Sequence, residues 1–218
     1  MLFAMAACLL AAGGTACHSV SHQPEVIAGV ESPSARIAHL KKLAEEVKKM
    51  DPGQKGQVAM ELTQQIQKEE DPLLRAEIIR TLTACGSPGA DGVLRAALKD
   101  PEADVRTLAC TLWGKRGDAE AVKLLADVLA GDEKDKDVRM AAARALGATH
   151  NPAAIAALGM ALAEKDPAMQ YCAVVSLRSV TDRDLGNDVD RWRAAIRDGS
   201  LQRADSPTLA ERLRRGTF

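Results

Sequence analysis

The sequence has few aromatic residues and almost no net charge. Its 218 residues include two Trp, one Tyr and two Phe, and 29 basic side chains are balanced by 30 acidic ones. With so few rings, the 46% of hydrophobic residues are dominated by Ala and Leu, which favour helices that pack through many small contacts. A net charge of −1 gives no field that would attract nucleic acid or an anionic membrane surface.

Motifs that carry catalysis are missing as well. The chain has no Gly-Lys-Ser/Thr phosphate loop, no Gly-x-Ser-x-Gly turn and no His-Glu-x-x-His metal motif. Its histidines, His18, His22, His39 and His150, are scattered, and we expect His150 to be a solvated turn residue rather than a general base. We therefore expect a protein that is not an enzyme, with no catalytic residue, no metal site and no cofactor.

Paired cysteines are missing from the body of the chain. Cys85, Cys110 and Cys172 are odd in number, fall in separate apolar runs and show no Cys-x-x-Cys spacing. Residues in different helices meet the geometry of a disulfide only by coincidence of register. We expect three reduced thiols that behave as small buried hydrophobic groups.

Charged residues are also missing from the first 17 positions, which are rich in Ala, Leu, Met and Phe. This run is shorter than the roughly 20 residues that span a bilayer and matches the core of a secretory signal. Gly14-Thr15-Ala16-Cys17 resembles a bacterial lipobox, which implies a signal peptide over 1–16, a lipid on Cys17 and a flexible spacer over 17–34. Cleavage without lipid, and a cytoplasmic protein with an apolar N-terminus, remain as alternatives.

What the chain does contain is an internal repeat. Arg75, Arg106, Arg139 and the related Gln170 each open an apolar helical run, at spacings of 31, 33 and 31 residues. A second run follows, with apolar residues on one helical face. Its members are Leu94 and Leu98, then Val122, Leu125 and Leu129, then Ile155, Leu158 and Leu162. Repetition at this period is typical of stacked helical hairpins.

Helix boundaries follow the same period. Three Asp-Pro pairs lie just before a first helix, where Asp is a good N-cap and Pro is tolerated in the opening turn. These pairs are Asp71-Pro72, Asp100-Pro101 and Asp166-Pro167. Gly114 and Gly147 share one position near the end of a first helix, where we expect left-handed C-caps.

The segment Val138-Arg139-Met140-Ala141-Ala142-Ala143-Arg144-Ala145-Leu146-Gly147 resembles the short HEAT-like repeats first associated with phycobilisome lyases. The resemblance covers roughly residues 71–198 and implies an all-α fold, a right-handed α-solenoid of about five HEAT-like helical hairpins. The approximate repeats are 35–70, 71–99, 100–134, 135–165 and 166–199, in a solenoid over 35–200 before a basic tail or cap over 201–218. In the first repeat, helices over 36–50 and 57–69 flank a turn at 51–56.

Two structural roles follow from this resemblance. In HEAT-like families an Asp near a turn pairs with an Arg early in the next helix, and Asp100 with Arg106 has that spacing. We expect the repeated Arg residues to form a stacking ladder, with ligand contacts along one edge as the alternative. Residues 181–188 resemble the closing segment of bacterial HEAT arrays, which implies that Asp188 caps a last helix and Trp192 covers the last hairpin. An exposed Trp192 that contacts a ligand is the alternative.

The resemblance also gives an expected function. Deoxyhypusine hydroxylases with this repeat hold metal with paired His-Glu ligands, and this chain has no His-Glu dipeptide. Second helices line the concave face of HEAT-like solenoids, so Arg95, Lys123, Asp127 and Met160 are the predicted contacts. We expect a non-catalytic scaffold or adaptor of the cell envelope that binds an unidentified protein or peptide and no nucleic acid. The alternative is an accessory subunit of an enzyme complex, including a lyase-type HEAT protein.

Overall fold

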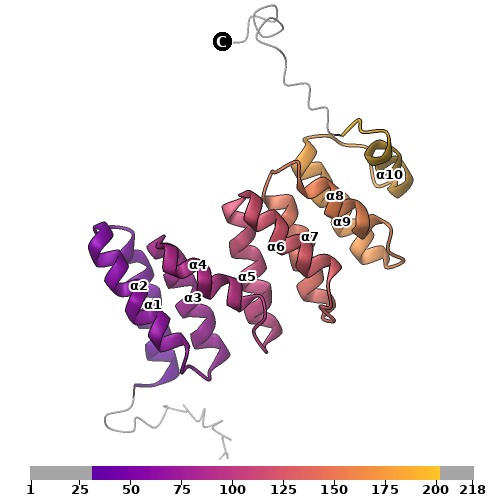
Figure 1. Ribbon diagram of the computed structural model, residues 1–218. Helices are drawn as coiled ribbons and strands as arrows, with labels where there is room; N and C mark the ends of the chain where they lie inside the picture. Colours follow the sequence, from indigo (N-terminus) through magenta and orange to yellow (C-terminus); the bar gives the residue numbers. More distant parts are fainter. Residues whose placement is uncertain (1–30, 202–218) are drawn as a thin grey trace, which may run out of the picture. The chain divides into compact units, whose positions relative to one another are not determined.

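The structure, a computed structural model, describes residues 31–201. Over this range it is all-helical, with ten α-helices and no β-strand (Figure 1). The helices are α1 Pro33–Val47, α2 Pro52–Ile66, α3 Pro72–Cys85, α4 Pro88–Ala97, α5 Ala103–Arg116, α6 Ala119–Ala130, α7 Lys136–Ala148, α8 Ala154–Leu162, α9 Pro167–Thr181 and α10 Val189–Arg197. The predicted signal peptide, Cys17, the spacer up to residue 30 and the tail after residue 201 lie outside the described residues. Among the ten helices, none is both long and apolar enough to cross a membrane.

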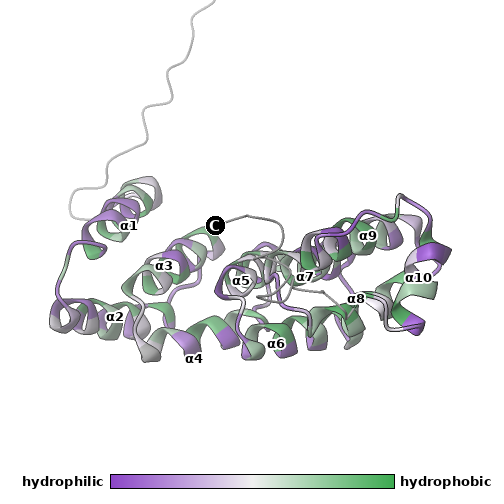
Figure 2. Ribbon diagram, turned by 90° about the horizontal axis from the view of Figure 1, so that it is seen from above, coloured by the Kyte–Doolittle hydropathy of each residue, from purple (hydrophilic) through white to green (hydrophobic). Residues whose placement is uncertain are grey.

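The helices form five hairpins that stack in chain order. The first helices contact one another in the series α1, α3, α5, α7 and α9 and make one layer. Contacts of α2 with α4, of α6 with α8 and of α8 with α10 make the second layer. Figure 2 shows these layers as two rows of helices. The predicted all-α solenoid of HEAT-like hairpins is therefore confirmed.

Asp residues cap several helices, as the sequence predicts. Asp71 accepts hydrogen bonds from the backbone N–H groups of Leu73 and Leu74 at the start of α3. Equivalent caps are Asp135 on α7, Asp166 on α9 and Asp188 on α10. Each cap satisfies amide donors that the helix itself leaves without a partner. The predicted role of Asp188 is thus confirmed.

Two predicted boundaries are wrong. Asp100 is not an N-cap, because Arg75 and the backbone N–H of Glu102 hold its carboxylate and α5 begins only at Ala103. The expected turn at 51–56 is instead the first turn of α2. There Asp51 caps the helix, and the side chain of Gln54 accepts a hydrogen bond from the Asp51 backbone N–H.

Gly114 and Gly147 lie inside α5 and α7, so their predicted role as C-caps is wrong. A left-handed cap does end α5, but it is Gly117, with φ 67°. The two helical glycines allow neighbouring first helices to approach closely. A Cβ on Gly114 would lie 2.9 Å from Cα of Ala145, and one on Gly147 would lie 2.8 Å from Cα of Ser176. Glycine is required here by packing and not by backbone conformation.

The interface between α3 and α5 is built differently. By repeat position, Thr83 and Leu112 stand where the next two interfaces have glycine against Ala145 or Ser176. The distance between packed helix axes grows with the side chains at the contact. Consistent with this, α3 touches α5 far less extensively than α5 touches α7.

Trp113 adds further bulk in the same repeat, on the side of α5 that meets α4. The other repeats have a leucine at its position, namely Leu82, Leu146 and Leu177. Trp113 is fully buried and its Nε1 donates to the Leu94 carbonyl of α4 at 3.3 Å. The guanidinium of Arg116 lies 4.6 Å from the Trp113 ring centroid and pairs with Asp91 of α4 at 2.5 Å. These contacts hold α4 against α5, whereas α4 and α6 scarcely touch.

Other packing predictions are confirmed. Trp192 is fully buried and its Nε1 donates to the Gly186 carbonyl at 2.8 Å. It therefore packs on the last hairpin and is not exposed to solvent. Cys85, Cys110 and Cys172 are buried, free thiols. Burial raises the pKa of Cys110 to about 12, which keeps this thiol protonated and unreactive.

Replacing Gly147 by Ala should destabilise the protein by about 1–3 kcal/mol, because the added Cβ would collide with the backbone of Ser176. The matched control is Gly92→Ala in α4, where a Cβ would meet nothing within 4 Å. That variant should gain about 0.4–1 kcal/mol from the stiffer unfolded chain. Urea denaturation measures both free energies of unfolding, and changes of the same sign would contradict the close approach of α7 and α9.

Candidate binding site on the second-helix layer

Repeated arginines close each of the first four hairpins at its open end. Each one lies early in the first helix and forms an ion pair with an acidic residue that follows the second helix of the same hairpin. The pairs are Arg36–Glu69, Arg75–Asp100 at 2.7 Å, Arg106–Glu133 at 2.7 Å and Arg139–Glu164 at 2.6 Å. The fifth hairpin has Gln170, which donates to the Glu164 carbonyl at 2.6 Å.

These pairs form a ladder, but the predicted pairing of Asp100 with Arg106 is wrong. Arg106 donates to the backbone carbonyls of Asp100 and Pro101 at 2.8 and 3.0 Å, while its charge pairs with Glu133. The guanidinium groups of Arg75, Arg106 and Arg139 therefore each link the end of the previous hairpin to the end of their own. Bidentate geometry accounts for this, since one planar guanidinium serves carboxylate and carbonyl acceptors at once.

The ladder is electrostatically tight. Burial opposes ionisation of Glu133, but hydrogen bonds from Arg106 and from the Asp135 N–H outweigh it and lower the pKa of the carboxyl. The pKa of Asp100 is lowered in the same way. Burial raises it, but hydrogen bonds from Arg75 and from the Glu102 N–H outweigh that effect. These arginines and carboxylates are thus occupied by each other and are poor candidates for ligand contacts.

A groove lies between α4 and α6, where the second layer is loosely packed. Its volume is about 890 Å³. Its lining includes Arg95, Ala96, Lys99, Leu124, Asp127 and Val128, above the Arg106–Glu133 pair. Arg95 also donates from Nε to Glu120 at 2.6 Å and so joins α4 to the first turn of α6. We call this the α4–α6 groove.

Four charged side chains in this groove have no hydrogen bond or ion pair within residues 31–201. They are Lys99, Asp127, Asp132 and Lys134, and all are exposed. Among the apolar members of the lining, Ala96 is exposed, Leu124 and Val128 are half-buried and Leu98 is buried. Such a surface offers accessible apolar area together with unpaired charges of both signs, which another protein's charges can complement.

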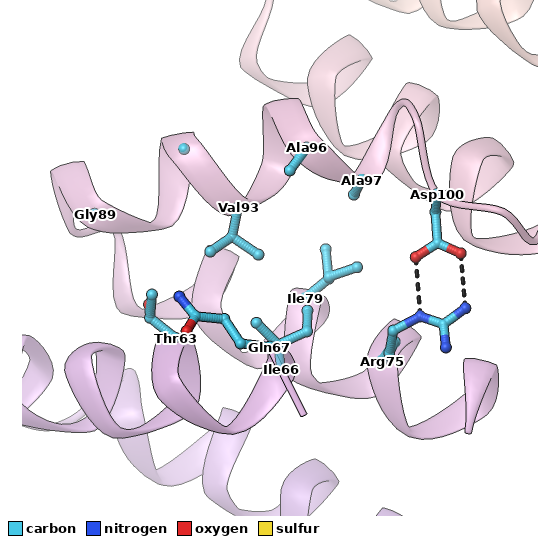
Figure 3. Close-up of a pocket in the computed structure, with 11 residues that line it drawn as sticks. Thr63, Ile66, Gln67, Arg75, Ile79, Gly89, Val93, Ala96, Ala97 and Asp100 are labelled. Atoms are coloured by element: carbon cyan, nitrogen blue, oxygen red, sulfur yellow. Dashed lines mark hydrogen bonds and ion pairs between the residues drawn. The ribbon is translucent and has the colours of Figure 1, made fainter. Parts of the chain in front are cut away.

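A second groove of about 450 Å³ lies on the other side of α4, against α2 and α3. Figure 3 shows Ile66, Ile79 and Val93 pointing into it from three different helices. The Arg75–Asp100 pair lies at one end, where the two charges neutralise each other (Figure 3). We call this the α2–α4 groove, and it is mostly apolar.

Comparison with known proteins agrees with this architecture. Residues 59–136 match the family model described as HEAT repeats. This match covers less than half of the chain, and over those residues the chain is similar to HEAT repeats. The matched residues run from within α2 to the start of α7 and include both grooves.

Two solved structures are similar to this chain. Human deoxyhypusine hydroxylase in complex with glycerol is 26% identical, with a TM-score of 0.51, and the match covers 57% of this chain and 44% of the hydroxylase. The chain therefore spans less than half the length of that enzyme. An engineered protein is 18% identical, with a TM-score of 0.45 and a match over 86% of this chain and 89% of the engineered one. A search of curated proteins gave no match.

The predicted contact residues divide into two groups. Arg95 and Asp127 both line the α4–α6 groove, although Arg95 is already paired with Glu120. Lys123 on α6 and Met160 on α8 are exposed, but they lie outside the lining of both grooves. His150 is an exposed turn residue whose Nδ1 lies 3.0 Å from the Ser179 carbonyl. Across residues 31–201, no cluster of three or more His, Cys, Asp or Glu side chains is arranged to hold a metal.

Sequence reasoning missed the α2–α4 groove. A usable signal was present in Gly89 and Gly92, two glycines in the ten-residue helix α4. A Cβ on Gly92 would meet nothing within 4 Å, and one on Gly89 would meet only Ser87 Oγ at 3.9 Å. Unlike Gly114 and Gly147, neither is required by contacts within the chain, although each costs a helix about 0.5–1 kcal/mol relative to Ala.

Reversing the charge of Arg106 to Glu should lower the free energy of unfolding by about 1–3 kcal/mol, between the values for exposed and buried ion pairs. The side chains of Arg106 and Glu133 are only 16% and 13% exposed, so the variant places two carboxylates together with little screening. The control Arg95→Glu breaks a solvent-exposed pair and should change stability far less. Thermal unfolding measures both, and an unchanged melting temperature for Arg106→Glu would contradict the ladder.

Proposed function

We propose that this HEAT-repeat protein is a non-catalytic scaffold that binds another protein through the second-helix layer, at the α4–α6 groove. The observation that supports this most directly is the gap between α4 and α6, because the neighbouring helices α6 and α8 do pack against each other. The groove combines half-buried apolar side chains with Lys99, Asp127, Asp132 and Lys134. Those charges are available to a partner, because the ladder does not use them.

Charge balance favours a protein over a nucleic acid as the partner. The basic side chains of the lining are Arg95, Lys99, Arg106 and Lys134, and the acidic ones are Asp100, Asp127, Asp132 and Glu133. Four positive and four negative charges give no net attraction for a phosphate backbone. Peptide chains carry charges of both signs and can complement such a surface.

An accessory subunit of an enzyme complex, including a lyase-type HEAT protein, is the second candidate, and it uses the same surface. Likeness to deoxyhypusine hydroxylase favours a third candidate, an enzyme in its own right. The resemblance to HEAT-like repeats implies that a hydroxylase of this kind would hold its metal with paired His-Glu ligands. This sequence has no His-Glu dipeptide. The proposal therefore assigns a binding role rather than the hydroxylase reaction.

Site-specific photo-cross-linking in cells that produce the protein tests the binding role. A cross-linking amino acid at Ala96 or at Asp127, on opposite walls of the groove, should capture the same partner polypeptide. The same amino acid at Ala168, exposed on α9 in the first-helix layer, should not. Asp132→Lys should weaken capture at Ala96 by about tenfold, because it reverses a charge available to the partner.

Two results would count against this function. Equal capture at Ala168 and Ala96, or no capture in the groove, would remove the evidence for a binding surface there. Stoichiometric iron or another transition metal in the purified protein, measured by atomic emission, would instead contradict the non-catalytic part.

We also propose that the protein is exported and carried in the cell envelope, held there by a lipid on Cys17. The support is the uncharged run before Cys17 and the small residues Gly14 and Ala16 beside it. Labelling of cells with a fatty-acid analogue should mark the wild-type protein and not Cys17→Ser. Equal labelling of the two would contradict the anchor, and recovery of both from the cytoplasm would contradict export.

A further inference from the structure

The two grooves flank one helix and differ in chemistry. Both are lined by Ala96 and Asp100, so they meet at the C-terminal end of α4. In the α2–α4 groove the only charged side chains are Arg75 and Asp100, which neutralise each other, and the rest of the lining is apolar or uncharged. The α4–α6 groove carries the unpaired charges. An occupant that fills both must therefore be apolar along one side and charged along the other.

The surface of α4 between the grooves is almost bare. Gly89, Gly92 and Ala96 are exposed at successive turns of the helix, so little side-chain volume separates one groove from the other. The distance between the axes of two packed helices is about 8–10 Å, and it is shortest where the contact residues are small. A second helix could therefore lie close to this surface of α4. The backbone groups of α4 are already used within the helix, so this surface offers no edge to which an extended peptide could hydrogen-bond.

From this combination we propose that the occupant is an amphipathic α-helix of a partner protein, lying along α4. Its apolar side chains fill the α2–α4 groove around Val93, and its charged flank meets Lys99 and Asp127 in the α4–α6 groove. A helix carries such apolar and charged stripes side by side at its natural period. This inference rests on the proposed scaffold function and adds to it the conformation and chemistry of the partner segment.

Panning a phage-displayed library of random peptides of about 14 residues, which span roughly 21 Å as a helix, tests the inference. The full chain serves as bait, and peptides that also bind the Gly92→Leu variant are removed by counter-selection. Enriched peptides should carry apolar residues at helical spacing beside charges of both signs. In fluorescence anisotropy their affinity should fall about tenfold for Gly92→Leu, which fills the bare surface, and about tenfold for Asp127→Lys.

Controls separate binding from folding. Ala156→Leu adds the same side chain to an exposed position of α8 outside both grooves and should leave affinity unchanged. Gly92→Ala, with open space around its Cβ, should stay folded and still weaken binding, by less than Gly92→Leu. A proline in the middle of an enriched peptide should abolish binding, because it breaks a helix and not an extended chain.

The contrary results are specific. Peptides that lack helical spacing, tolerate the central proline or bind Gly92→Leu as well as wild type would overturn the helix proposal. So would panning that enriches nothing over the counter-selected variant. If a partner is nonetheless cross-linked at both Ala96 and Asp127, only the helical occupant fails and the scaffold function stands. If neither cross-linking nor panning succeeds, both fail.

Discussion

Close packing between first helices sets the position of the second helices as well. Where glycine meets Ala145 or Ser176, the axes of α5, α7 and α9 come together, and the attached helices α6 and α8 pack against each other too. Between α3 and α5, the larger residues Thr83 and Leu112 stand at the positions of the glycine and its small partner. In the same repeat Trp113 replaces a leucine. There α3 and α5 make less contact, and α4 and α6 scarcely touch. The α4–α6 groove is therefore produced by side chains in the opposite layer, and none of those side chains needs to touch a partner.

The arginine ladder limits which charges can take part in binding. It crosses the hairpin ends beneath both grooves and ties Arg75 to Asp100 and Arg106 to Glu133. Because the carboxylates also accept backbone N–H bonds, exchanging one of these pairs for a partner's charge would leave a half-buried ion and a helix end without their hydrogen bonds. In the proposed scaffold role, recognition would therefore rest on the exposed charges that the ladder does not use, namely Lys99, Asp127, Asp132 and Lys134.

The repeat period was enough to predict the hairpins and the Asp caps of α3 and α9, because each depends on residues close in sequence or on one helical face. The cap of α10 and the burial of Trp192 were instead implied by the resemblance of residues 181–188 to the closing segment of HEAT arrays. The repeat period gave the wrong role for Gly114 and Gly147. In the sequence, a glycine near the end of a helix looks the same whether it adopts a left-handed C-cap or allows a neighbouring helix to approach closely. The predicted partner of Arg106 was also wrong. Asp100 follows Arg75 by 25 residues much as Glu133 follows Arg106 by 27, and only the tertiary structure shows that each Arg pairs with the acidic residue at the end of its own hairpin. Half of the candidate contacts, Arg95 and Asp127, lie in a groove, but the gap itself depends on distances that no local pattern encodes.

The proposed binding surface lies where the hairpins contact one another least. The buried core divides into a smaller cluster, mostly from α1 to α3 with Ala90 of α4, and a larger one that runs from Ile79 of α3 to the C-terminal helices. Ile66 and Val93 pack against both. In a repeat protein, stability is approximately a sum over hairpins and nearest-neighbour interfaces, so the interface with the fewest contacts is the one at which the array opens most readily. A helix bound along α4 would cover Ile66 and Val93 and bridge α4 to α6, adding contacts where the chain has fewest. Its binding free energy would then hold the two parts of the array together, because any ligand that requires the closed interface stabilises it by mass action.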